Sequence, residues 1–323
     1  MSDIKNASAL SEKELFSPIA GDTISSEKII APRYSYWKSV FRVFFRKKIN
    51  IFMIGLLVFI ILVAFIMPYF WPYDLMENIM DAKTFNLSPA AAQKYFGGFS
   101  FKWILGSGAY GNSIMYGIVS SARTSLLLAV ICAAINMTIG IIVGAFWGYS
   151  KRVDQIMIVV YNIVANVPYI LLITVLVYII GSGFWSFVFA LTVTGWLSIA
   201  YFFRTQVMII RDREYSLASR CLGTPVTRVI SKNILPFLTS VIVTLLATEL
   251  PSYISMEVFL SYIGVGLSAT VPSLGRMIQQ AQTAFLTYPW EFWPPVIVAS
   301  AITIILYVLG QNLADASDPR THM

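Results

Sequence analysis

Charged residues are scarce in this chain. Only 12% of its 323 residues are Asp, Glu, Lys or Arg, whereas 57% are hydrophobic. A soluble domain ordinarily carries about a quarter charged residues. The shortage therefore excludes an ordinary soluble globular protein and predicts a chain that has lipid as its solvent.

Histidine and cysteine are nearly absent. The single histidine, His322, lies second from the end, so we expect neither a histidine-based metal site nor a histidine base. Two cysteines are too few for a disulfide framework, and Cys132 lies in an apolar run while Cys221 lies in a basic stretch.

Catalytic motifs are missing as well. The sequence contains no G-x-x-x-x-G-K-[ST], no HExxH, no CxxC and no Ser/His/Asp constellation. Without the first of these motifs the chain cannot bind ATP through a Walker A loop. We predict that the chain has no catalytic residue, no metal and no cofactor, and that it is not an enzyme in its own right.

What the sequence does have is long apolar segments. Six of them approach the ~20 residues that a helix needs to cross a bilayer. They are residues 49–70, 124–147, 155–180, 184–210, 237–258 and 296–313. Because lipid cannot satisfy open backbone groups, each segment is predicted to be helical. The predicted class is an all-α polytopic membrane protein with six transmembrane helices.

The basic residues indicate how the chain is oriented. A net charge of +7 could indicate a nucleic-acid partner, but the basic residues lie beside apolar spans, as juxtamembrane charges do. They gather at residues 46–48, 151–152 and 211–232, which share one side of a six-span chain. By the positive-inside rule we expect a multi-pass cell-membrane protein with both termini in the cytoplasm.

The remaining segments complete the predicted layout. Residues 1–33 are polar and are predicted to be a flexible cytoplasmic tail. Residues 34–48 have an apolar and a basic face at helical spacing, which predicts an interfacial amphipathic helix, although a plain basic flank explains them equally well. Residues 71–123 are predicted to be a small extracellular insertion, and residues 314–323 the cytoplasmic C-terminus.

The most informative segment is the basic loop of residues 211–236. It predicts a short helix, a break at Gly223-Thr224-Pro225, a second basic helix, and a proline at the start of the next span. Small side chains on the first helix, including Ser216 and Ala218, leave a surface that another protein can approach closely.

This loop resembles the EAA loop of ABC-importer permeases, in which a helix–glycine–helix element docks into a cleft of the ATPase. Leu217-Ala218-Ser219 stands at E-A-A, Gly223 at the glycine and Leu235-Pro236 at the final L-P. Leu217 replaces the family's glutamate and Asn233 replaces its isoleucine. The resemblance implies these ATPase-coupling residues: Glu214, Tyr215, Ala218, Ser219, Arg220, Gly223, Thr224 and Pro225.

Three further stretches resemble the same family in the same order, at residues 105–126, 257–275 and 310–320. Together with the loop they resemble the second permease subunit of oligopeptide ABC importers, the OppC/AmiD type in its Gram-positive form. The resemblance implies a type I importer permease fold, with residues 124–313 as the permease core.

The resemblance also implies partners. These are a homologous second permease subunit, two ATPase subunits that bind ATP and Mg, and an extracellular, lipid-anchored binding protein that delivers the peptide. Alternating access driven by ATP is the implied mechanism. Importers of dipeptides, nickel, haem or antimicrobial peptides are alternatives within the class. An ion-coupled secondary transporter is the alternative outside it, although few intramembrane ionisable residues and no clear inverted repeat are present.

Polar residues within the spans are candidates for the translocation path. Asn162, Asn166, Tyr169 and Glu249 are chosen because a polar group in the membrane must face protein or water. Hydrogen bonds between helices explain the two asparagines equally well.

Two other features have two interpretations each. Glu257 is expected to pair with Arg276 or to cap a re-entrant helix. Gly140, Gly144 and Gly148 are spaced for close helix contact, either within the chain or with the partner permease.

Overall fold

A computed structural model describes residues 35–268 and 270–318. The predicted tail of residues 1–33 and the last residues, 319–323, lie outside this range. The chain divides into two units, residues 1–39 and 40–323. Helix α2 (Tyr36–Arg46) corresponds to the predicted amphipathic helix, with Val40 and Phe44 buried. All that follows concerns the second unit.

The regular structure of the second unit is helical. Its long helices are α3 (Lys48–Phe70), α5 (Ile114–Tyr149), α9 (Trp196–Arg211), α12 (Thr239–Tyr262) and α14 (Pro289–Ser317). Five helical stretches in the described residues are long and apolar enough to cross a membrane. A sixth is obtained if α6 (Lys151–Ala165) and α7 (Tyr169–Ile180), which are bent by 78°, form one broken span. The predicted all-α membrane class is confirmed.

One predicted helix boundary is wrong. Helix α5 begins at Ile114, not at Thr124, because Ser113 caps it by accepting the backbone N–H of Tyr116 at 3.3 Å. The folded insertion therefore ends near Ser113, and residues 114–123 form the first turns of α5.

One of the predicted continuous spans is broken. The predicted third span divides into α6 and α7 around Pro168. The predicted fourth span is found as one helical stretch, Phe184–Arg211, in which turns at residues 193–195 separate α8 (Phe184–Thr192) from α9. Irregular backbone at membrane depth is tolerated only where it is buried in protein or lines a cavity, so the break around Pro168 marks a place to look for a site.

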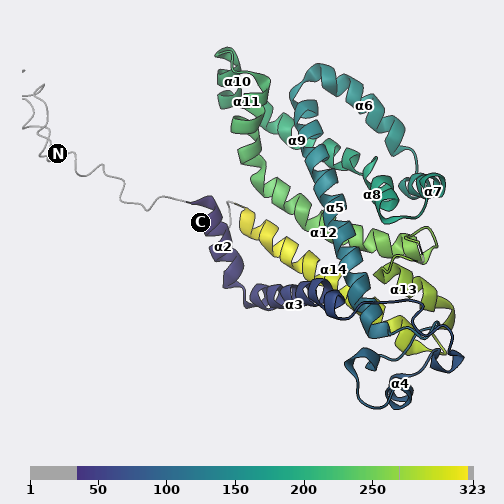
Figure 1. The fold of residues 1–323 in the computed structure, drawn as a ribbon. Coiled ribbons are helices and arrows are strands. Elements are labelled where there is room, and N and C mark those ends of the chain that lie inside the picture. The colour runs from purple at the N-terminus through teal and green to yellow at the C-terminus, as the bar shows by residue number, and fades with distance from the viewer. Residues whose placement is uncertain (1–34, 269, 319–323) are drawn as a thin grey trace, which may run out of the picture. The chain divides into compact units, whose positions relative to one another are not determined.

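Helix α5 is the central element of the packing, and it runs alongside α9 (Figure 1). Its three spaced glycines, Gly140, Gly144 and Gly148, all face α9. A Cβ atom added at Gly144 would lie 2.6 Å from the carbonyl oxygen of Ala200, and one at Gly148 would lie 2.6 Å from that of Arg204. These glycines therefore serve packing within this chain.

The insertion between α3 and α5 is folded around α4 (Pro89–Tyr95). The rings of Phe96 and Trp103 stack with centroids 3.9 Å apart. Ser107 Oγ donates to the Thr84 carbonyl at 2.5 Å. The amide of Asn112 donates to the hydroxyl of Tyr73 at 3.0 Å, and burial raises the pKa of Tyr73 to about 12. The segment is thus a small packed structure with its own hydrogen bonds.

Glu257 is fully buried beneath the short helix α13 (Leu274–Ala281). Its carboxylate accepts hydrogen bonds from Ser125 Oγ and Ser261 Oγ, both at 2.9 Å, and from the backbone N–H of Gly275. No ion pair with Arg276 occurs among the described residues. Of the two interpretations from the sequence, capping is therefore the one that fits.

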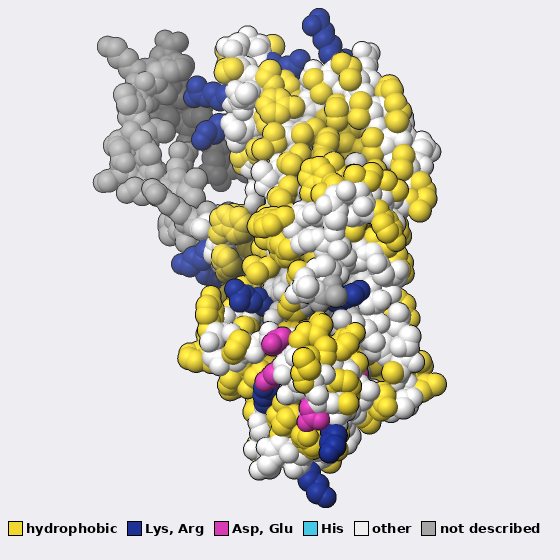
Figure 2. All heavy atoms as spheres, turned by 45° about the vertical axis from the view of Figure 1, so that its right-hand side comes forward, with side chains coloured by type: hydrophobic (Ala, Val, Ile, Leu, Met, Phe, Trp, Pro, Cys, Tyr) yellow, Lys and Arg dark blue, Asp and Glu magenta, His cyan; other side chains and the backbone are white. Residues whose placement is uncertain are grey.

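The surface of the molecule is strongly apolar. Figure 2 shows hydrophobic side chains over much of one face. Large side chains such as Phe52, Phe59 and Ile297 are more than half exposed on the outer helices α3 and α14. Such a surface suits lipid or another membrane subunit.

Candidate functional site

The first arm of loop 211–236 is helix α10 (Glu214–Cys221). Gly223 follows it with φ of +75°, the left-handed conformation that side chains other than glycine rarely adopt. The N–H of Gly223 donates to the Arg220 carbonyl at 3.0 Å, and that of Thr224 donates to the Ser219 carbonyl at 3.1 Å. This pair of hydrogen bonds is a Schellman motif, which ends the helix at a fixed angle.

The second arm contains α11 (Val226–Arg228), the π-helical turn η5 (Val229–Ile234) and η6 (Leu235–Leu238), which leads into α12. The amide of Asn233 donates to Ser219 Oγ at 2.7 Å. The rings of Tyr215 and Phe237 lie 5.2 Å apart. The two arms are therefore folded onto each other.

The loop lies at one end of α5 and α9 (Figure 1). Arg211 is buried and donates from Nη1 to the carbonyl of Gly148, at the end of α5, at 2.9 Å. Its Nε and Nη2 donate to the carboxylate of Asp212, both at 3.0 Å. These hydrogen bonds hold the pKa of Asp212 below its usual range, so the pair stays charged at neutral pH.

The outer side of the loop exposes apolar residues between basic ones. The exposed fractions are 43% for Leu217, 85% for Leu222 and 42% for Val226. Exposed basic residues on the same loop are Arg213, Arg220, Arg228 and Lys232. Large apolar side chains exposed together are typical of a protein-binding surface.

The structure places the predicted coupling residues on this one element. Glu214, Tyr215, Ala218, Arg220, Gly223 and Pro225 are exposed, whereas Ser219 and Thr224 are half-buried. Leu222 is the most exposed apolar residue of the loop and is absent from the predicted set. An apolar residue directly before the helix-ending glycine was the signal available in the sequence.

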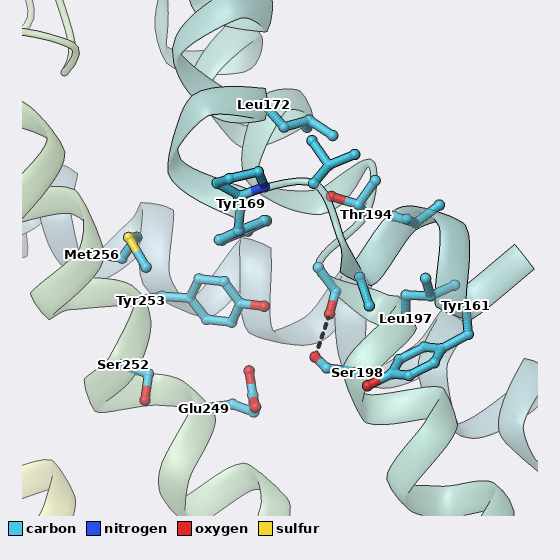
Figure 3. Close-up of a pocket in the computed structure, with 15 residues that line it drawn as sticks. Tyr161, Tyr169, Leu172, Thr194, Leu197, Ser198, Glu249, Ser252, Tyr253 and Met256 are labelled. Atoms are coloured by element: carbon cyan, nitrogen blue, oxygen red, sulfur yellow. Dashed lines mark hydrogen bonds between the residues drawn. The ribbon is translucent and has the colours of Figure 1, made fainter.

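A second site is a cavity of about 460 Å³ beside the break around Pro168 (Figure 3). Its walls come from the α6–α7 break, the turns between α8 and α9, and the middle of α12. Tyr169 and Glu249, both predicted path residues, line it. Asn162 and Asn166 do not line it; the amide of Asn166 donates instead to the backbone carbonyl of Asn162 at 2.5 Å.

Several polar residues of the cavity were not predicted from the sequence. They are Thr194, Ser198, Ser252 and Tyr253. The Thr194-Gly195 pair within an apolar run was the available signal, because glycine weakens a helix. Within the described residues, no three His, Cys, Asp or Glu side chains are grouped as they would be to bind a metal ion.

Together these features define a polytopic helical membrane protein with an exposed basic loop at one end and a polar cavity beside a broken helix, the architecture of a membrane permease. Residues 136–323 match the family described as binding-protein-dependent transport system inner membrane component, and residues 35–89 match the N-terminal TM domain of oligopeptide transport permease C. The chain belongs to the family of binding-protein-dependent transport system inner membrane components and is a non-catalytic membrane subunit.

Three relatives cover nearly the same length. The chain is 46% identical to the oligopeptide transport system permease protein AmiD of Streptococcus pneumoniae, over 96% of this chain and 98% of the relative. It is 32% identical to the oligopeptide transport system permease protein OppC of Bacillus subtilis, over 95% and 97%. It is 31% identical to the dipeptide transport system permease protein DppC of Bacillus subtilis, over 91% and 89%.

Proposed function

We propose that this chain is one of two homologous permease subunits of an ATP-driven oligopeptide importer in the cell membrane. It would form half of the translocation path and would receive peptide from an extracellular binding protein. The observation that carries this proposal is the exposed helix–glycine–helix loop, which is rigidly mounted on α5 and α9 in a chain that is similar to oligopeptide permeases over nearly its whole length.

In this proposal the loop of residues 211–236 docks onto a separate ATPase subunit. Leu217, Leu222 and Val226 would be buried in the contact, and the surrounding arginines would face acidic groups of the partner. Because Arg211 ties the loop to Gly148, movement of the docked loop would be transmitted to the ends of α5 and α9. This is the physical basis for coupling ATP hydrolysis to movement of the transmembrane helices.

The proposed orientation places the loop and both termini in the cytoplasm and the insertion around α4 outside the cell. The positive-inside rule supports it, because the loop and the segments before α3 and α6 carry most of the Lys and Arg residues near the spans. The cavity would form part of the path, with Tyr169 and Glu249 among the groups that face the peptide.

The native cysteines provide a test of docking. Cys221 is exposed on α10, whereas Cys132 is buried. In the intact complex, a short thiol-to-amine cross-linker should join Cys221 to the ATPase subunit, and the adduct should vanish in Cys221→Ser but not in Cys132→Ser. If Cys221 is modified but gives no adduct with the ATPase, with or without ATP, the docking assignment is wrong.

Transport by the reconstituted complex tests the substrate. Proteoliposomes that contain both permeases, the ATPases and the binding protein should take up labelled oligopeptides only when ATP is supplied to the ATPase. Dipeptides measured alongside distinguish the two substrate classes of the relatives. Uptake that persists without ATP would indicate an ion-coupled carrier instead.

A further inference from the structure

The cavity beside the break around Pro168 contains an acidic group. Glu249 is the one acidic or basic residue among the described residues that line it. None of the ion pairs among the described residues includes Glu249. A carboxylate within a membrane span is energetically costly unless protein, water or a ligand compensates it.

A hydrogen bond from α5 positions the tyrosine that lies beside this carboxylate. The amide of Asn136, which is fully buried on α5, donates to the hydroxyl of Tyr253 at 2.5 Å. Glu249 lies one helical turn earlier on α12 and lines the same cavity as Tyr253. A carboxylate offers several acceptor positions to a ligand that donates hydrogen bonds.

The rest of the lining suits a positively charged group. In Figure 3 the side chains of Glu249 and Tyr253 project from one wall, opposite Thr194 and Tyr161. The Thr194 hydroxyl is buried and has no hydrogen-bond partner, so one polar atom of the wall is unsatisfied. Tyrosine rings bind cations through their faces. With no Lys or Arg among the described lining residues, the cavity should disfavour a carboxylate.

The site also lies where irregular backbone meets the cavity. Helix α7 starts at Tyr169, and its hydroxyl donates to the carbonyl of Leu191 at 2.7 Å. Leu191 lies one residue before the end of α8. Discontinuous helices of this kind form substrate sites in other membrane carriers.

We infer that Glu249 and Tyr253 form a binding subsite for a primary ammonium group of the transported peptide. This inference rests on the proposed function, because it assigns that substrate a contact inside the membrane. The ammonium group could be the peptide N-terminus or a lysine side chain. Both present three N–H donors and one positive charge to the carboxylate.

The test combines a change in the protein with a change in the peptide. Uptake into proteoliposomes that contain the complete transporter is measured for the wild type and for Glu249→Gln. Three peptides of equal length are used: one with a free N-terminus, its N-acetylated form, and an N-acetylated form that contains lysine. Because the binding protein is the same throughout, its preferences cancel when variant and wild type are compared for each peptide.

We expect Glu249→Gln to lower uptake of the free-amine peptide about tenfold at subsaturating concentration, the loss of one charge-assisted hydrogen bond. Uptake of the lysine-free acetylated peptide should change less than about twofold by the same reasoning. Glu249→Asp, which keeps the charge, should retain more uptake than Glu249→Gln. Ser252→Ala alters the same wall without changing its charge. This variant should therefore change the uptake of all three peptides by the same factor.

The outcomes separate the two proposals. If the lysine peptide is also sensitive to Glu249→Gln, the subsite accepts a side-chain ammonium; if only the free-amine peptide is sensitive, it accepts the N-terminus. If Glu249→Gln assembles into the complex but lowers the uptake of all three peptides equally, or of none, the subsite proposal is wrong. The proposed function as an oligopeptide importer is unaffected by that result. A wild-type complex that transports no oligopeptide would instead overturn the proposed function.

Discussion

The side-chain amide of Asn233 donates to Ser219 Oγ at 2.7 Å, and the same hydroxyl donates to the Tyr215 carbonyl at 3.0 Å. The second arm of the loop is thus fastened to the first arm by consecutive hydrogen bonds. Asn233 stands where the resembling family pattern has isoleucine, which cannot make this contact. These hydrogen bonds hold the two arms of the loop together.

Removing this contact should loosen α10. We expect Ser219→Ala and Asn233→Ala each to increase hydrogen exchange in residues 214–222. The double variant should show a coupling free energy of about 1 kcal/mol, typical of one hydrogen bond. Ser231→Ala is the matched control, because the Ser231 hydroxyl bonds only to the nearby Arg228 carbonyl. Strictly additive effects would show that the two side chains do not interact.

Replacing Gly223 should uncouple ATP hydrolysis from uptake for a conformational reason. Nothing lies within 4 Å of a Cβ atom added there, but its φ of +75° strains any L side chain by about 1–2 kcal/mol. We expect Gly223→Ala to lower the peptide taken up per ATP hydrolysed, and the larger Gly223→Asn to lower it less, since asparagine tolerates this conformation. The measurement is ATPase activity and uptake in the same vesicles. A ranking that follows side-chain volume instead would contradict this explanation.

The contact between α5 and α9 should be intolerant of added volume. At Gly144 a Cβ atom would meet backbone atoms of Ala200, at 2.6 and 3.0 Å, which cannot move aside. We expect Gly144→Ala to destabilise the permease by about 1–3 kcal/mol, the usual cost of overpacking. Thermal unfolding of the purified complex measures the change.

Gly55 provides the control for Gly144. It lies in α3 with nothing within 4 Å of an added Cβ atom, so Gly55→Ala should be neutral or stabilising by up to ~1 kcal/mol through helix propensity. Similar losses at both positions would show that the contact with α9 is not the cause.

Local signals in the sequence predicted much of the fold and of the loop. Apolar length predicted the spans, and Gly223 before Thr224-Pro225 predicted the break in the loop. Predictions failed where a local cap or break interrupts an apolar run. The start of α5 depends on the side chain of Ser113, and the division of the third span depends on the turn at residues 166–168, neither of which hydrophobicity alone can reveal.

Contacts between segments that are distant in the chain could not be predicted from a single sequence. The spacing of Gly144 and its neighbours predicted a close helix contact but not whether α9 or another subunit supplies it. Glu249 was a candidate because it is acidic, but the neighbouring hydrogen bond from Asn136 to Tyr253 joins α5 to α12 across more than 100 residues. Contacts of this kind depend on the tertiary fold, which neither periodicity nor motif spacing specifies.

Glu257 should determine the position of α13. Glu257→Ala would leave three serine hydroxyls, of Ser125, Ser261 and Ser273, and the N–H of Gly275 without this acceptor. We expect a loss of about 3 kcal/mol in stability and faster hydrogen exchange across residues 274–281. Glu257→Gln keeps one acceptor oxygen but adds an amide whose own donors must be satisfied, so its loss should be intermediate.

The control for Glu257 is Glu214→Ala, since Glu214 is exposed and its removal should change stability by less than about 0.5 kcal/mol. Thermal unfolding separates the three variants, and hydrogen exchange shows where each one loosens. Loosening confined to residues 274–281 and the neighbouring turns of α5 and α12 would identify α13 as the element that the carboxylate holds. If Glu257→Ala leaves both measurements unchanged, the hydrogen bonds around this carboxylate do not position α13.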